Sequence, residues 1–173
     1  MKLSPRLLIL SCMLLLSTSI SAQLQFDRLS FKGFNATGFG GFFNFSVPVS
    51  EADYITGEMG LDVFSSNGNN VVLVPLLAGY RYSINRSGTG FYVEPNIGYS
   101  IGATDIQLQD AGGNYYDQKI SGAATGVGVG YLFEPAGRIQ FNLAIRYEHV
   151  FGNAGQNLLS FRISHAFTFG RRQ

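Results

Sequence analysis

The segment Phe91-Tyr-Val-Glu-Pro-Asn-Ile-Gly-Tyr-Ser-Ile101 decides the fold of this chain, because its apolar and polar residues alternate. One parity carries Phe, Val, Pro, Ile, Tyr and Ile, and the other carries Tyr, Glu, Asn, Gly and Ser. Side chains of a β-strand point alternately to the two faces of a sheet, so the segment predicts a strand with one apolar face. The segment Leu159-Ser-Phe-Arg-Ile-Ser-His-Ala-Phe-Thr-Phe169 repeats this pattern.

The polar parity of these segments carries charged side chains, among them Glu94 and Arg162. A carboxylate or guanidinium group that faces lipid is costly, so the polar side chains are expected inside a closed sheet and the apolar ones outside. Closure also satisfies every backbone hydrogen-bonding group, as a membrane requires. The predicted fold is therefore an all-β, eight-stranded, antiparallel, up-and-down transmembrane barrel. A soluble periplasmic ligand-binding barrel, with its apolar face inside, is the alternative.

Seven clear strands are separated by clusters of Gly, Asn, Asp, Ser and Pro, which favour turns. They are predicted at Gly38–Val47, Tyr54–Phe64, Val71–Ile84, Phe91–Ile101, Lys119–Phe133, Arg138–Val150 and Leu158–Phe169. Two of them contain a proline, Pro75 or Pro95, which removes a hydrogen bond from the sheet. A β-bulge at either proline is expected to absorb this loss and to change the facing locally.

An eighth strand is expected near the N-terminus, because bacterial barrels of this kind have an even number of strands. Arg28–Gly33 is the predicted strand, followed by a turn at Asn35–Thr37. Its apolar face carries Leu29 and Phe31, and its polar face carries Arg28, Ser30 and Lys32. A single long strand from Ser30 to Val47 is the alternative interpretation.

Residues 1–22 are predicted to be a secretory signal peptide that is cleaved after Ala22, leaving residues 23–173 as the barrel domain. Lys2 and Arg6 form a basic start, and an apolar stretch and a run of small residues follow. A lipoprotein acylated at Cys12 is disfavoured, because the apolar stretch continues beyond that cysteine. The apolar stretch is too short for a spanning helix, and no later segment is long and apolar enough for one.

Composition narrows the class of function. The chain has 12 basic and 11 acidic residues, so it lacks the concentrated positive charge of a nucleic-acid-binding protein. Its one cysteine lies in the predicted signal peptide, which leaves no disulfide and no thiolate metal ligand in the mature chain. We assign no catalytic, cofactor-binding or metal-binding residue and expect no cofactor.

Strand parity predicts which connections lie on which side of the membrane. If the last strand ends in the periplasm, the periplasmic connections are 48–53, 85–90 and 134–137. The extracellular connections are then 34–37, 65–70, 104–118 and 151–156. The longest connection, 104–118, falls outside, as is usual for outer-membrane barrels, and we expect it to contact any extracellular partner. Its Tyr115 and Tyr116 supply aromatic contact area of the kind enriched in interfaces.

Aromatic residues on the apolar parity sort into two predicted girdles at the two membrane–water boundaries. The periplasmic girdle comprises Phe45, Tyr80, Tyr82, Phe91, Tyr131, Phe133, Phe167 and Phe169. The other girdle comprises Phe39, Tyr99, Tyr147 and Phe161.

The segments Val74–Tyr82, Gly90–Gly102 and Leu143–Val150 resemble the small outer-membrane β-barrel domain common in Bacteroidota, of the OmpX and OmpA barrel type. The resemblance implies a Gram-negative outer-membrane protein in contact with membrane lipid and lipopolysaccharide. The last strand, Leu158–Phe169, also resembles the C-terminal signal read by the barrel-insertion machinery, although His165 interrupts its apolar parity and residues 170–173 extend beyond it. The family motifs imply fold and location rather than one activity.

The inward parity carries charged residues, and these are the candidates for chemistry in the lumen. They are Glu58, Asp62, Arg81, Glu94, Arg138, Arg146, Glu148 and Arg162. A symmetric turn at 85–90 places Arg81 opposite Glu94. A selective polar channel is one interpretation, and a packed core of ion pairs is favoured, because the interior of an eight-stranded barrel is only wide enough for its side chains.

The stretch Arg146–Ala154 is similar to the lipid A deacylase motif of small outer-membrane barrels, with His149 and the pair Asn153-Ala154 recognisable. Phe151 stands where that motif has its nucleophilic serine, so no acyl transfer is expected. Ser160 lies outside the motif position. His149 and His165, on separate predicted strands, are a weak signal for a metal site. The glycines of Gly126–Gly130 lie within a predicted strand and are no nucleotide-binding loop.

Overall fold

The computed structural model describes residues 19–31, 34–86, 88–109, 115–117, 120–134, 139–152 and 155–168. Its long strands are β1 (Ser19–Phe31), β2 (Phe34–Pro48), β3 (Asp53–Ser66), β4 (Asn69–Ser83), β5 (Gly90–Thr104), β8 (Gly122–Leu132), β9 (Ile139–Phe151) and β10 (Gln156–Thr168). Two short strands, β6 (Gln107–Gln109) and β7 (Tyr115–Asp117), pair only with each other. Within the described ranges, no helix is long and apolar enough to cross a membrane.

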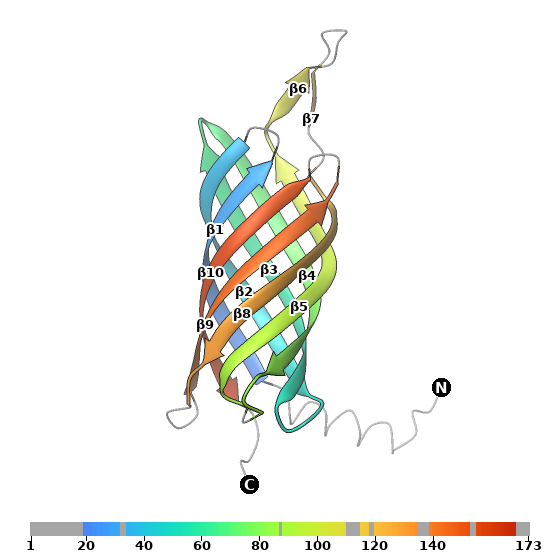
Figure 1. The fold of residues 1–173 in the computed structure, drawn as a ribbon. Helices are drawn as coiled ribbons and strands as arrows, with labels where there is room; N and C mark the ends of the chain where they lie inside the picture. Colours follow the sequence, from blue (N-terminus) through green and yellow to red (C-terminus); the bar gives the residue numbers. More distant parts are fainter. Residues whose placement is uncertain are drawn as a thin grey trace, which may run out of the picture.

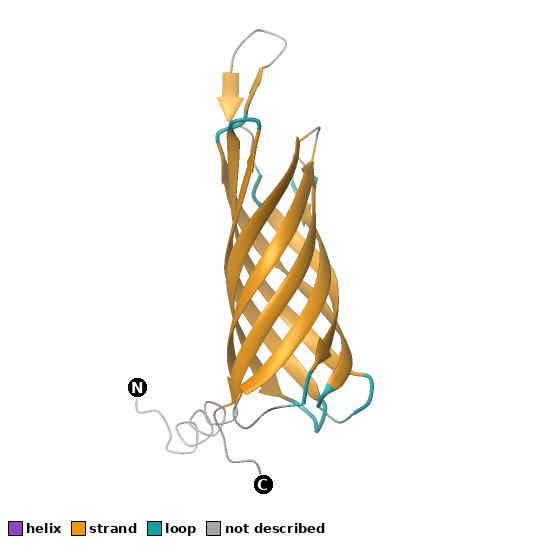
Figure 2. Cartoon of the chain, turned by 90° about the vertical axis from the view of Figure 1, so that its left-hand side faces the viewer, coloured by secondary structure: helices purple, strands orange, loops and turns teal. Residues whose placement is uncertain are grey.

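The long strands close into one antiparallel barrel in the order β1-β10-β9-β8-β5-β4-β3-β2 (Figure 1). Closure comes from β1, which pairs with β2 on one side and with β10 on the other, from Ser19–Thr168 to Ser30–Asn157. The strands run steeply tilted around a tall, narrow body (Figure 2). The predicted eight-stranded up-and-down barrel is therefore confirmed. Seven of its strands lie within a few residues of their predicted bounds.

The first strand differs from its prediction. β1 spans Ser19–Phe31, so it begins nine residues before the predicted strand Arg28–Gly33 and ends two residues before it. The expected cleavage site after Ala22 lies inside β1. Asn35–Thr37, predicted as a turn, belongs to β2, because the hairpin already pairs Phe31 with Phe34. The alternative of one long strand from Ser30 to Val47 is wrong for the same reason. Alternation alone did not locate this tight hairpin, because both of its strands carry the pattern up to the turn.

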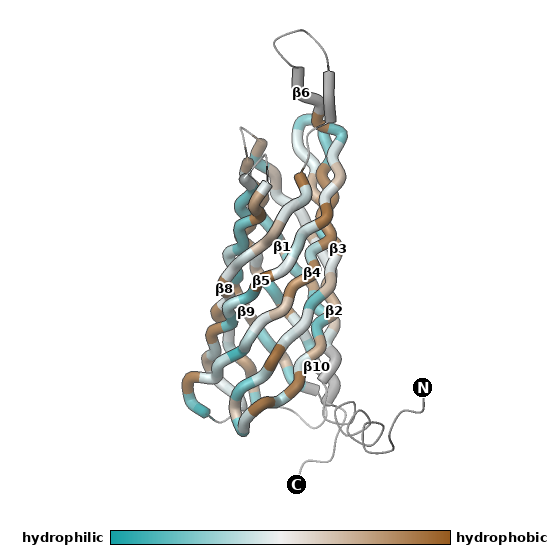
Figure 3. Tube along the Cα trace, turned by 90° about the vertical axis from the view of Figure 1, so that its right-hand side faces the viewer, coloured by the Kyte–Doolittle hydropathy of each residue, from teal (hydrophilic) through white to brown (hydrophobic). Residues whose placement is uncertain are grey.

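Side chains alternate between the outer surface and the lumen along every long strand. In β5, Phe91, Ile97 and Ile101 are exposed on the outside, whereas Glu94 and Asn96 are buried. In β10 the exposed residues Phe161 and Ile163 alternate with the buried residues Arg162 and Ser164. The colours of the chain trace alternate accordingly along the strands (Figure 3). The apolar outer surface and the largely polar interior predicted for a membrane barrel are thus both present.

Neither proline produces the expected bulge. The pairing of β3 with β4 stops next to Pro75 and resumes in the same register, and the pairing of β4 with β5 does the same beside Pro95. Each proline therefore interrupts the ladder for two residue pairs without shifting it. Facing is unchanged on both sides, since Glu94 and Asn96 are both buried.

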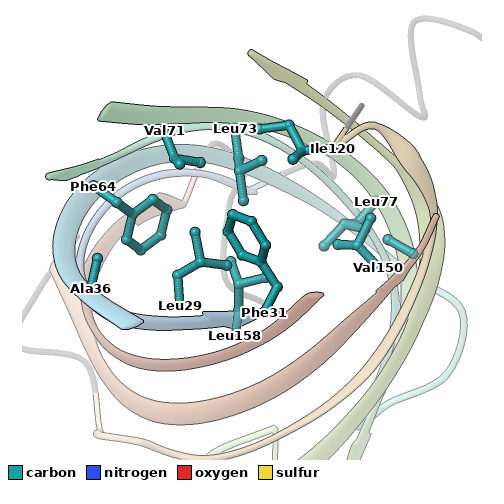
Figure 4. Close-up of a cluster of buried hydrophobic side chains, with 11 residues drawn as sticks. Leu29, Phe31, Ala36, Phe64, Val71, Leu73, Leu77, Ile120, Val150 and Leu158 are labelled. Carbon is teal, nitrogen blue, oxygen red and sulfur yellow. The ribbon is translucent and has the colours of Figure 1, made fainter. Parts of the chain in front are cut away.

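An apolar plug fills the lumen at the end of the barrel that carries β6 and β7. We define the plug as Leu29, Phe31, Ala36, Phe64, Val71, Leu73, Leu77, Ile120, Ala124, Val150 and Leu158. Figure 4 shows its labelled side chains converging inside the barrel wall from several strands. The rule of an apolar exterior would place Leu29 and Phe31 outside and Arg28 inside, and the structure reverses this: both apolar residues are buried and Arg28 is exposed.

The long connection between β5 and β8 includes the ribbon of β6 and β7, which rises above the barrel (Figure 1). Asp105 anchors the end of the connection nearest β5, because the backbone and side-chain amides of Asn70 donate to the Asp105 carboxylate at 2.6 and 3.0 Å. Ile106 packs against the plug, and Ile120, at the end of the connection nearest β8, belongs to the plug. The side-chain amide of Gln156 also donates to the Ile120 carbonyl at 2.5 Å. Both ends of the connection are thus fixed to the barrel by hydrogen bonds and apolar contacts.

Candidate functional site

An ion-pair network crosses the middle of the lumen and joins residues from five strands. We define the network as Arg81, Glu94, Arg146, Glu58 and Arg162. Arg146 lies at its centre, with one guanidinium nitrogen 2.7 Å from Glu58 and the other 2.9 Å from Glu94. Arg162 closes on Glu58 at 2.8 Å. All these side chains are nearly inaccessible, and each charge has an opposite partner, as burial of ions requires.

The predicted pair of Arg81 and Glu94 exists. The register of β4 and β5 pairs Tyr82 with Val93, which puts Arg81 opposite Glu94 at the next position. Arg81 Nε donates to Glu94 Oε2 at 2.6 Å, and the guanidinium lies 4.5 Å from the centre of the Tyr92 ring. A contact between a cation and a ring face adds stabilisation where water is excluded. The turn symmetry that motivated the prediction therefore holds despite the adjacent proline.

Buried carboxylates lie beside the network without an arginine of their own within 4 Å in the described residues: Asp27, Asp62 and Glu148. The amide of Gln25 donates to Asp62 at 2.7 Å. Asp62 occupies the space that a Cβ atom would need at its cross-strand partner Gly40. Asp27 was missed because the predicted first strand began one residue after it. Alternation carried upstream through the exposed Leu24 and Phe26 would have placed Asp27 inside.

The glycines of Gly126–Gly130 lie in β8, as predicted, and their role is steric. A Cβ atom at Gly130 would collide with the Tyr92 ring, and one at Gly126 would press on Asn96 and the backbone of β9. Missing side chains on this strand leave room for those of the neighbouring strand β5, where Tyr92 pairs with Gly130 and Asn96 with Gly126. This matters in a lumen only wide enough for its own side chains.

The lumen is filled rather than open over its described length. A cavity of about 40 Å³ lies at the end opposite the plug, lined by polar residues such as Ser21, Asn44 and Ser164. A second cavity, of about 10 Å³, lies within the ion-pair network. One buried water needs roughly 10–15 Å³, so these cavities have room for only a few waters. The packed-core interpretation agrees with this geometry.

The structure places the remaining inward candidates as follows. Glu58, Asp62, Glu148 and Arg162 are buried as predicted, whereas Arg138 lies outside the described residues. His165 lies on the outer parity of β10 and is partly buried. In the described residues, no group of three or more His, Cys, Asp or Glu side chains is arranged to hold a metal ion.

In the stretch similar to the deacylase motif, His149 and Phe151 lie on the outer face of β9. Phe151 is exposed and its ring meets the His149 ring edge-on at 4.6 Å between centres. Ser160, the nearby serine, is buried on the inward parity of β10, whereas His149 lies on the outward parity of β9. The two face opposite sides of the barrel wall, so they cannot form a nucleophile–base pair. Asn153 and Ala154 lie outside the described residues.

The predicted girdle residues whose side chains are described all face outward. Those near the end with the polar cavity include Phe91 and Tyr131, whose rings meet edge-on at 4.9 Å. Near the plug end, Phe39 and Phe161 are exposed, and Phe26 lies between them in the same cross-strand row. The side chains of Phe167 and Phe169 lie outside the described residues.

No protein-family model and no curated protein sequence matches the chain. Solved structures do resemble it. Neisserial surface protein A has a TM-score of 0.62 at 10% identity, over 88% of this chain and 97% of that one. Ail of Yersinia pestis, in complex with the heparin analogue sucrose octasulfate, gives 0.62 at 14% identity over 88% and 98%. OprG from Pseudomonas aeruginosa gives 0.57 at 8% identity over 90% and 97%.

These likenesses show the fold. The chain has the closed, eight-stranded antiparallel architecture of small outer-membrane β-barrels.

Proposed function

We propose that this chain is a non-enzymatic integral outer-membrane protein, closed to solutes, that displays the β5–β8 connection outside the cell. Its role is adhesion, envelope integrity or binding of a partner. The observation that carries this proposal is the combination of an apolar outer wall with a lumen filled by the ion-pair network and the plug. Such a barrel can contact lipid around its circumference, and its surface ribbon is what remains for recognition.

The alternatives are less well supported. A soluble periplasmic barrel is disfavoured because large apolar side chains such as Leu24, Phe26 and Ile97 are exposed on the outer wall. A lipid A hydrolase lacks a serine beside His149 and has Phe151 there. A narrow pore would need a path through the plug, which is packed with Phe64, Leu73 and other fully buried side chains.

Export and family complete the proposal. We propose that residues 1–22 are removed as a signal peptide, that the barrel-insertion machinery assembles the mature chain, and that the protein belongs to the Bacteroidota barrel family. N-terminal sequencing of the mature protein tests the cleavage after Ala22. A mature chain that begins at Gln23 would retain nine of the thirteen residues of β1.

An epitope tag tests the topology. Inserted between Gly112 and Gly113, the tag is expected to bind antibody on intact cells, while the barrel still migrates faster than its heat-denatured form on a gel. A tag placed in the 85–90 turn is the matched control and should react only after the outer membrane is opened. The reverse result, or fractionation of the chain with the soluble periplasm, would contradict the proposal.

A further inference from the structure

Arg28 stands out on the outer wall of the barrel. It is exposed on β1, between the buried residues Asp27 and Leu29. Apart from Asp53, the first residue of β3, it is the only Asp, Glu, Lys or Arg among the described outward-facing residues of the barrel strands. An isolated cation at such a site is costly in hydrocarbon and becomes favourable only where an anion or water can reach it.

The position of Arg28 supplies that access. One residue row nearer the plug end, the outward residues form a polar line through successive cross-strand partners: Thr125, His149, Asn157, Ser30 and Asn35. All five lie within a few residues of a strand end. On the other side of Arg28 the wall turns apolar, with Phe26 and Phe161 exposed. Arg28 therefore lies where the apolar belt meets the polar rim.

Two residues of the polar line, His149 and Asn157, form a hydrogen-bonding cluster with Tyr147, which lies in the cross-strand row of Arg28. Tyr147 donates from its hydroxyl to Asn157 Oδ1 at 2.7 Å, and His149 Nδ1 lies 2.8 Å from the same oxygen. Because an amide oxygen only accepts, the imidazole donates from Nδ1, and Nε2 remains as its other hydrogen-bonding atom. Asn157 pairs with Ser30 across β1, so Arg28 is its diagonal neighbour, within reach of a long side chain.

We propose that Arg28 and the cluster of Tyr147, His149 and Asn157 form a binding site for a phosphorylated glycolipid of the outer leaflet. The Arg28 guanidinium would take a phosphate group through paired N–H donors, for which its planar fork is suited. Asn157 and His149 would meet sugar hydroxyls, and Phe26 and Phe161 would lie against acyl chains. This site rests on the proposed topology, which puts the plug end outside.

A sugar headgroup fits better than a compact phospholipid headgroup. The polar line crosses four strand-to-strand spacings of roughly 4.8 Å each, so it extends over about 19 Å. Among the described residues, it offers amide, hydroxyl and imidazole groups along that length and one nearby cation, Arg28. A headgroup with few phosphates and many hydroxyls matches this distribution.

Binding of purified lipids to the refolded protein in detergent, measured by native mass spectrometry, tests the site. The probes are bis-phosphorylated lipid A, dephosphorylated lipid A and phosphatidylglycerol. Arg28→Gln is expected to weaken binding of the phosphorylated lipid A by about tenfold or more, and Arg28→Lys by less, because the charge remains but the fork is lost. Arg86→Gln, an exposed arginine in the turn at the opposite end, is the matched control and should bind as wild type does.

Three results would overturn the site: equal binding by wild type and Arg28→Gln, equal binding of both forms of lipid A, or equally tight binding of phosphatidylglycerol. Asn157→Ala supplies a second line of evidence, because it removes the amide and leaves the charge. It should weaken binding of both lipid A forms. The faster gel migration of the unheated variants verifies that each is folded, and the tag in the 104–118 connection reports topology independently of this site.

Discussion

Two regions built on different physics fill the lumen. In the middle, the ion-pair network holds three guanidinium groups and two carboxylates in contact, so each side chain depends on its neighbours. At the ribbon end, the plug fills the same barrel with aliphatic and aromatic side chains that depend only on volume. A side chain that faces the lumen therefore need not be polar. A polar interior is stable when its charges are paired, and an apolar interior is stable when its space is filled.

The two regions should fail differently when a side chain is removed. A deletion in the network leaves a charge without its partner, whereas a deletion in the plug leaves a space. Substitutions in each region test this difference. Urea unfolding of the protein in lipid vesicles is measured for each variant by the difference in gel migration between the folded and the heat-denatured barrel.

Glu58→Gln should have the largest effect. Glu58 contacts both Arg146 and Arg162, so its loss leaves two buried guanidinium groups short of charge. We expect a loss of about 3–5 kcal/mol in the free energy of unfolding. Glu148→Gln is the matched control, because Glu148 is equally buried but has no ion pair among the described residues, and it should cost much less. Equal losses would mean that the pairs contribute nothing beyond burial.

Leu29→Ala tests the plug. Leu29 is fully buried, and truncation should cost about 2–5 kcal/mol through lost apolar contact and the cavity left behind. Leu24→Ala, on the outward parity of the same strand, should cost less, because lipid can fill the vacated space. If Leu24→Ala proved the more damaging, the facing of β1 would be the reverse of that described.

Ile97→Arg tests the outer wall against the lumen. Ile97 is exposed in the middle of β5, and an arginine there should cost about 2–4 kcal/mol near the bilayer midplane. Asn96→Ser, the inward neighbour, keeps a polar group in the lumen and should cost far less. Similar losses at both positions would argue that the wall does not contact lipid.

The pair of Arg81 and Glu94 should show the smallest effect, a coupling energy. A double-mutant cycle with Arg81→Gln and Glu94→Gln is expected to depart from additivity by about 0.5–3 kcal/mol. Glu94→Gln alone should cost more than Arg81→Gln, because Glu94 also binds Arg146. Strict additivity would show that the two side chains do not interact in solution.

Much of this fold was predictable from alternation, and the failures have physical causes. The pairing of Arg81 with Glu94 was predictable, because turn symmetry fixes register over a few residues. The facing of Leu29 and Phe31 was not, because a rule that puts apolar side chains in lipid cannot recognise an apolar plug. The three carboxylates beside the network show a different limit, the placement of strand ends. Sequence parity put Asp62 and Glu148 inside, and it missed Asp27 because the predicted first strand began one residue after it.

The long connection shows what local pattern cannot supply. Its position outside the barrel strands was predictable, but the contacts at its two ends depend on partners far along the chain. Asn70 binds Asp105, and Gln156 binds Ile120. Such contacts arise only once the barrel brings the strand ends together. The surroundings of Arg28 could not be predicted for a related reason, because its neighbours come from strands at opposite ends of the sequence.

Electrical conductance of the purified protein in planar lipid bilayers tests the closed lumen most directly. The wild-type barrel, with its plug and network intact, should insert without producing stepwise currents. Leu29→Ala should also remain silent, because the ion-pair network still closes the lumen beneath the plug. Reproducible conductance steps from the folded wild-type protein, with ion selectivity altered by Glu58→Gln, would contradict the account and establish a pore.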